Sequence, residues 1–167
     1  MSKKHLSYED ATEELNRFGI TGAQVYLIDL IPLLEMIWAD GKAQTTEVSI
    51  LVDYLKNHVN HINQLAGHQA LSLEEAKTFV AAFLKKRPDP ELLATLRSFI
   101  APVRLAGSDP VQSERLKESL LAACLDIGAS SVTEYPFGQN HRFNPDEKRC
   151  FFEILESLST DPSATLA

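Results

Sequence analysis

The sequence predicts an all-α protein that folds as a single domain of about seven helices. Apolar residues recur at helical spacing from Tyr8 to Leu158, the alternation typical of strands is nearly absent, and no Gly- or Ser-rich linker divides the chain. At 167 residues, with 44% hydrophobic and 23% charged residues, the chain has the size and composition of one globular domain. We expect this domain to span residues 1–167, with a core over about 7–158 and frayed termini.

The most apolar run, Val25–Ala39, is expected to form the central helix, starting near Ala23. It is apolar on nearly every side, as a helix in the middle of a domain is. Pro32 removes one backbone hydrogen bond and crowds the preceding turn, so we expect a kink there. The run spans about 15 residues and contains Asp29 and Glu35, so it falls short of the ~20 apolar residues that cross a membrane. A buried Asp29 requires a partner such as a lysine or arginine from a neighbouring helix.

The other helices are predicted from their start signals, which are a capping residue followed by an acid, or a proline in the first turn. These signals are Ser7 with Asp10, Thr45 or Thr46, Ser72 with Glu75, Asp89-Pro90-Glu91, Asp109-Pro110 and Asn144-Pro145-Asp146-Glu147. Gly19 is expected to end the first helix, and Lys85–Arg87 to lie in the last turn of the fourth. We expect a loop over Gln64–Ala70 and a bend before Pro102.

Charge and cysteine content exclude several classes of protein. The net charge of −7 and the pI of about 5.2 make nucleic acid an unlikely partner and favour a cation, a metal or a basic protein surface. The N-terminal segment has two lysines but no apolar run behind them, so it does not predict a secretory signal. The two cysteines, Cys124 and Cys150, fall within helical patterns and form no CxxC motif. We expect free, buried thiols and a cytoplasmic location.

The strongest candidate site is the corner made by Asp40-Gly41 and Glu47. Asp40 is expected in the last turn of the central helix, where a carboxylate faces the negative end of the helix dipole unless a cation compensates it. Glu47 is expected in the first turn of the next helix, so the short connection brings two hard oxygen ligands together, as a divalent cation requires. An EF-hand is excluded, because its first ligand positions would fall on Met36 and Trp38. The alternative is an Asp-Gly turn followed by a favourable first-turn acid.

A similar pattern follows at the end of the sixth predicted helix, with Asp126 and Gly128. An ungapped match between the two corners assigns Glu134 as the second acid, whereas an insertion in the loop assigns Glu147. We prefer Glu147, because it opens a helix as Glu47 does. The alternative is that Asn144 and Glu147 form only a capping box.

His58 and His61 lie three residues apart on the third predicted helix, a spacing that can bind zinc. A solvated helix face is the more common explanation of such a pair. The chain contains neither a Gly-x-Ser-x-Gly motif nor a Gly-rich phosphate loop, and no set of residues resembles an activated nucleophile.

The segment Leu33–Leu51 resembles the repeated motif of TerB-like tellurite-resistance proteins. In it, an apolar helix leads to Ala39-Asp40-Gly41, a short polar turn, Glu47 and a new helix. The similarity extends over roughly Val25–Leu158 and implies a TerB-like fold of about seven helices in two related halves. It implies a divalent-cation site that includes Asp40 and Glu47 and is completed by Asp126 and Glu147. The second half departs from the motif, since Asp126-Ile127-Gly128 replaces Asp-Gly.

The resemblance further implies a non-enzymatic, cytoplasmic stress-response protein that acts with a protein partner, often in a membrane-associated complex. Two alternatives remain open from the residues alone. One is a metal-free interaction module that recruits a basic partner through its acidic surface. The other is a carboxylate–histidine metalloenzyme that uses His58 or His61 beside Glu47.

Overall fold

The computed structural model describes residues 7–39, 45–105, 109–130 and 145–158, and within these ranges all regular structure is helical. The predicted all-α class with about seven helices is therefore confirmed. The elements are α1 (Tyr8–Arg17), the 3₁₀ helix η1 (Gly22–Leu30), α2 (Ile31–Trp38), α3 (Thr45–Ala66), α4 (Leu73–Leu84), α5 (Pro90–Ser98), the short π-helical segment η2 (Ala101–Leu105), α6 (Pro110–Ser130) and α7 (Pro145–Ser157). No helix in the described part of the chain is long and apolar enough to cross a membrane.

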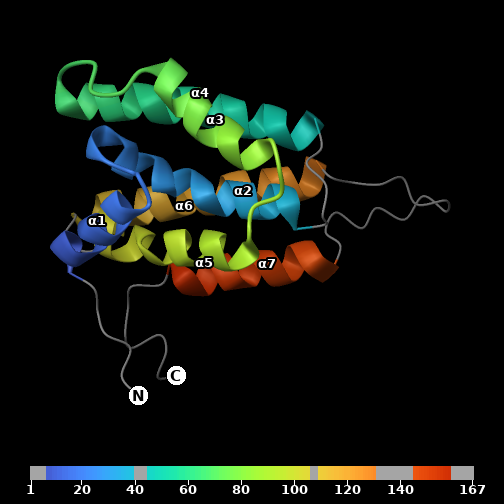
Figure 1. Ribbon diagram of the computed structural model, residues 1–167. Coiled ribbons are helices and arrows are strands. Elements are labelled where there is room, and N and C mark those ends of the chain that lie inside the picture. Colours follow the sequence, from blue (N-terminus) through green and yellow to red (C-terminus); the bar gives the residue numbers. More distant parts are fainter. Residues whose placement is uncertain (1–6, 40–44, 106–108, 131–144, 159–167) are drawn as a thin grey trace.

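Helix α2 occupies the middle of the molecule, as predicted for the most apolar run. It packs against α3 and α6 and also against α5 and α7, so that α3 and α4 lie on one side of it and α5 and α7 on the other (Figure 1). Six of its eight residues are buried, among them Leu33, Leu34 and Ile37. Burial of a leucine or isoleucine side chain stabilises the fold by about 1.5–3 kcal/mol, so α2 contributes strongly to the stability of the core.

The predicted kink at Pro32 within one long helix is wrong, because the run forms two helical elements. The run divides into η1 and α2, and Pro32 lies in the first turn of α2. The first backbone N–H groups of an α-helix have no partner within the helix, so a proline there costs no hydrogen bond. The chain therefore accommodates the proline by changing from 3₁₀ to α-helical geometry just before it, rather than by bending one long helix.

The start signals at Ser7, Ser72, Asp89 and Asp109 are confirmed. Thr45 and Thr46 are instead the first two residues of α3, so neither is its cap, and Asn144 lies outside the described residues. The Asp10 amide donates to Ser7 Oγ at 3.1 Å, the Glu75 amide to Ser72 Oγ at 3.0 Å, and the Glu91 amide to Asp89 Oδ1 at 3.0 Å. Gly19 follows α1 with a φ of +83°, a left-handed conformation that favours glycine. The expected bend before Pro102 coincides with η2.

Two predicted helix ends are wrong. The loop expected from Gln64 begins later, because α3 continues to Ala66 and ends at Gly67, whose φ is +75°. Conversely, α4 ends at Leu84, so the basic residues from Lys85 onward follow the helix instead of forming its last turn. The sequence marks a helix start more sharply than an end, because the residues that cap a start do so through local hydrogen bonds.

Asn63 holds the connection between α3 and α4. Its Nδ2 donates to the Leu71 carbonyl at 2.9 Å, and its Oδ1 accepts from the Leu71 amide at 3.0 Å. Leu71 is only 1% exposed, so water cannot replace both bonds. We expect Asn63→Ala to lower the free energy of unfolding by about 2 kcal/mol, because it leaves two buried backbone groups unpaired.

Urea denaturation of the Asn63 variants checks this expectation. Asn63→Asp is the isosteric comparison, since it keeps the acceptor but replaces the donor with a carboxylate oxygen that faces the Leu71 carbonyl, so it should also lose at least half as much stability. A change within about 0.5 kcal/mol for Asn63→Ala, as for an ordinary surface substitution, would contradict the proposed clamp.

Candidate functional site

Two of the predicted metal ligands, Glu47 and Glu147, are buried in the first turns of their helices. Glu47 is the third residue of α3 and is fully buried, and Glu147 is the third residue of α7 and is 2% exposed. The starts of α3 and α7 lie at the same end of the bundle as the ends of α2 and α6 (Figure 1). The fold thus brings the predicted corners, α2 to α3 and α6 to α7, to one end of the molecule.

The other predicted metal ligands are either outside the described residues or exposed. Asp40 and Gly41, and also Glu134, lie outside the described residues. Asp126 lies near the end of α6 with an exposed side chain, whereas the next residues, Ile127 and Gly128, are buried. The structure therefore places Glu47 and Glu147 in the protein interior and Asp126 at its surface.

The position of the two glutamates follows from local chemistry. An acid at the third position of a helix can accept hydrogen bonds from the helix start, and it lies at the positive end of the helix dipole. Glu47 and Glu147 each take part in a polar or electrostatic interaction with the rest of the chain. Capping explains why a glutamate is favoured at these positions, but a cap at a solvated helix start does not require burial.

The carboxylates of Glu47 and Glu147 are ligands of the kind that a hard divalent cation binds. Carboxylate oxygens are the ligands that Ca²⁺, Mg²⁺ and Mn²⁺ prefer, and such ions accept backbone carbonyls and water for the remaining positions. Within the described residues, no group of three or more His, Cys, Asp and Glu side chains could by itself hold a metal. A site at this end would therefore take its further ligands from backbone carbonyls, from water or from the predicted corner acids Asp40 and Asp126.

Asp29 forms a buried polar cluster with Arg104 and His58. Its side chain is fully buried, and its Oδ2 accepts from Arg104 Nε at 2.9 Å and lies 3.2 Å from His58 Nε2. The expected cationic partner of Asp29 is thus confirmed as an arginine from η2. The second oxygen, Oδ1, has no hydrogen-bond partner among the described residues.

The solvated face predicted for the two histidines is correct for His61 and wrong for His58. His61 is exposed, whereas His58 is 6% exposed and stacks on Tyr54 with ring centroids 5.7 Å apart. His58 Nε2 also lies 3.0 Å from the Tyr26 carbonyl, so this nitrogen is engaged within the core. His58 and Glu47 are separated by about three turns of α3, too far for both to bind one ion.

A second buried ion pair joins Glu35 of α2 to Arg97 of α5. Arg97 donates to Glu35 Oε2 at 2.6 Å, and both side chains are about nine-tenths buried. Burial raises the pKa of Glu35 to about 7, outweighing the lowering by Arg97, and Glu153 adds to the rise. Glu35 also lines a cavity of about 150 Å³ with Trp38, Cys150 and Glu153. An acid within an apolar run indicated this buried position, but nothing in the sequence identified Arg97 as its partner.

Both cysteines are free, as predicted, and Cys124 is buried while Cys150 is half-buried. Burial raises the pKa of Cys124 well above its ordinary value and that of Cys150 to about 12. A thiol reacts as its thiolate, so the surroundings of both cysteines disfavour nucleophilic chemistry at neutral pH.

No family model matches the chain, and neither a curated protein nor a solved structure matches it. The assignment of a function therefore rests on the geometry described above.

Proposed function

We propose that this protein is a non-enzymatic cation-binding protein, with a divalent ion held at the end of the bundle where the α2–α3 and α6–α7 corners meet. Glu47 and Glu147 are the buried ligands of this site. Asp40 and Asp126, which precede them in the two corners, are the acids that would complete it. On the resemblance to TerB-like proteins, we assign the protein to a cytoplasmic stress response in which a protein partner recognises the metal-bound form.

The observation that carries the proposal is the burial of two first-turn glutamates from opposite halves of the chain at one end of the fold. Both carboxylates are buried, and removing a carboxylate from water costs several kcal/mol that its surroundings must offset. A divalent cation between the corners would offset the cost for both carboxylates at once. It would also link the two halves of the bundle, so binding should stabilise the fold.

Thermal unfolding with and without Ca²⁺, Mn²⁺ or Zn²⁺ tests the proposal. A ligand at 100 times its Kd stabilises the folded state by about 2.7 kcal/mol. For a domain of this size that corresponds to a rise in Tm of about 5–10 °C. We expect at least one of the hard ions, Ca²⁺ or Mn²⁺, to produce this rise.

Glu47→Gln and Glu147→Gln are the informative variants. Glutamine can replace glutamate in a capping box, so these variants should keep their helix starts. They remove the charge that a cation needs, so the rise in Tm should disappear. If the variants keep the full response to the ion, the two glutamates are not its ligands and serve only their helix starts.

A further inference from the structure

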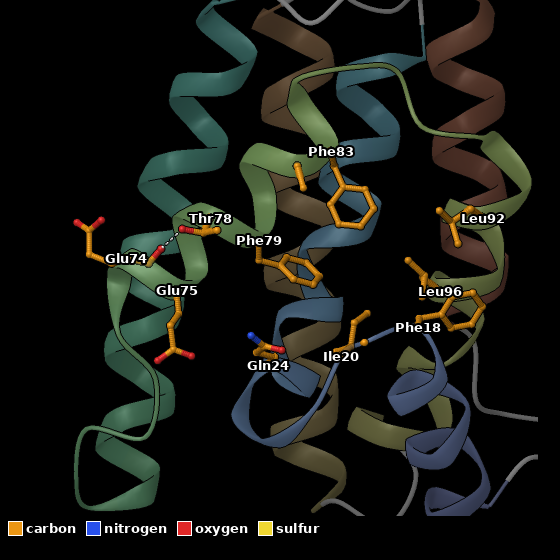
Figure 2. A pocket seen from close by; sticks show the side chains of 12 residues that line it. Phe18, Ile20, Gln24, Glu74, Glu75, Thr78, Phe79, Phe83, Leu92 and Leu96 are labelled. Atoms are coloured by element: carbon orange, nitrogen blue, oxygen red, sulfur yellow. Dashed lines mark hydrogen bonds between the residues drawn. The ribbon is translucent and has the colours of Figure 1, made fainter.

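A hollow in the described part of the chain is separate from the proposed cation site at the α2–α3 and α6–α7 corners. It has a volume of about 540 Å³ and lies between α4 and α5, with its remaining walls from η1 and from the residues that follow α1. Figure 2 shows Phe79 and Phe83 of α4 on one side of this hollow and Leu92 and Leu96 of α5 on the other. We call this hollow the α4–α5 pocket.

The α4–α5 pocket is lined mainly by apolar side chains, and the charged side chains that line it are acidic. Phe18 and Ile20 complete the apolar surface, and Phe18 is 45% exposed although it is a large aromatic side chain. The charged residues that line the pocket are Glu74 and Glu75, and no lysine or arginine lines it. In Figure 2 the Glu74 carboxylate points away from the apolar residues. Glu75 precedes Phe79 by four residues and so lies on the same face of α4, at the rim of the pocket.

The walls of the pocket are held in place by contacts outside it. The Trp38 indole Nε1 donates to the Phe83 carbonyl at 3.0 Å and thereby fastens the last turn of α4 to the end of α2. At the other end of α4, Ser72 caps the helix, and its hydroxyl lies 3.4 Å from Glu75 Oε1. Phe79 and Phe83 pack on each other with ring centroids 5.3 Å apart. The pocket is therefore largely formed before any ligand binds.

We propose that the α4–α5 pocket binds a small organic amine with an aromatic or branched aliphatic body. The volume lies within the range of about 300–1,000 Å³ that is typical of small-molecule sites. The combination of an apolar lining with a few polar groups is also typical of such sites. The faces of Phe79 and Phe83 attract a cation as well as an apolar surface. Glu75 supplies the carboxylate that pairs with the ammonium group, and the body covers Phe18.

Binding of three matched probes tests the charge preference. These probes are 4-phenylbutylamine, 4-phenylbutanol and 4-phenylbutyrate, which share one apolar body and carry a positive, neutral or negative head. The chain has a single tryptophan. Because Trp38 bonds to a residue that lines the pocket, its fluorescence should report occupancy. We expect the amine to bind about threefold more tightly than the alcohol, as one partly exposed ion pair allows, and the acid most weakly.

Three variants place the binding in the pocket. Ala82→Phe fills the pocket and should abolish binding of the amine, whereas Ala81→Phe adds the same ring to the exposed surface of α4 outside the lining and should leave binding unchanged. Glu75→Gln keeps the capping box and should equalise the Kd values of amine and alcohol.

Three results would overturn the proposal. The first is equal binding of amine and acid by the wild-type protein. The second is unchanged amine binding by Ala82→Phe. The third is the absence of binding together with a concentration-dependent dimer that Ala82→Phe abolishes, because this would assign the pocket to a second copy of the chain.

Discussion

Replacing Arg104 with methionine should lower the free energy of unfolding by about 3–5 kcal/mol, the usual cost of removing one partner of a buried ion pair. Asp29 is fully buried, and Arg104 is the cation that bonds to its carboxylate, at 2.9 Å. Methionine keeps much of the length of the apolar stem but removes the guanidinium, which also lies over the Tyr26 ring at 4.6 Å. The loss therefore reports mainly a buried carboxylate without its arginine, with His58 at 3.2 Å as its remaining neighbour. Urea denaturation at pH 7 measures it.

The control for this prediction is the double variant Asp29→Asn/Arg104→Met. It removes the buried negative charge together with its partner, so it should recover a large part of the lost stability. The expectation is contradicted if Arg104→Met costs less than about 1 kcal/mol, the value of an exposed pair. It is also contradicted if the double variant is no more stable than the single one.

Raising the pH from about 5 to about 8 should destabilise the protein through Glu35 by about 3 kcal/mol. The pKa of this carboxyl is 4.5 in its ordinary state and about 7 in the folded protein. Between these values the folded state holds a proton that the unfolded state has released, so stability falls as pH rises and levels off above the folded pKa. Arg97, Glu153 and Cys150 are the titratable groups that surround Glu35.

Comparison with Glu35→Gln isolates this contribution. Glutamine can still accept from Arg97 but does not titrate, so the difference in unfolding free energy between the two proteins should change by about 3 kcal/mol over this range. Glu118→Gln, at an exposed position of α6, should leave the pH dependence as in the wild type. Parallel stability profiles for wild type and Glu35→Gln would show that Glu35 ionises normally in the folded protein.

The features that the sequence predicted correctly are those set by neighbouring residues. Ser7, Ser72 and Asp89 cap their helices through hydrogen bonds within three residues, so the type and order of the helices could be predicted. The apolar Val25–Ala39 run predicted a central element because its composition alone demands burial. Its division into η1 and α2 was missed, since the choice between 3₁₀ and α geometry depends on packing around Pro32.

Features that depend on distant residues could not be predicted. Asp29 signalled the need for a partner, but Arg104 lies far along the chain and only the fold brings it close. His58 lies on the apolar stripe of α3, three residues after Leu55 and four before Ile62, so helical spacing could have indicated its burial, but not that Asp29 is its neighbour. The α4–α5 pocket draws on four separate segments, and none of them carries a motif.

Glu47 and Glu147 combine a feature that could be predicted from neighbouring residues with one that depends on distant residues. Their place in the first turns of α3 and α7 was predicted from the spacing, whereas the burial of Glu47 and Glu147 became visible only in the fold. That burial separates a cation site from an ordinary helix cap, and it is therefore the property on which the proposed function depends.

The metal content of untagged protein, purified without chelators and measured by elemental mass spectrometry, tests the cation site most directly. The site predicts close to one divalent ion per chain, lost in the Glu47→Gln/Glu147→Gln variant while that variant keeps its helical circular dichroism. A metal-free wild-type protein that also fails to take up Ca²⁺, Mg²⁺, Mn²⁺ or Zn²⁺ on titration would contradict it. The acidic corners would then serve only as helix caps.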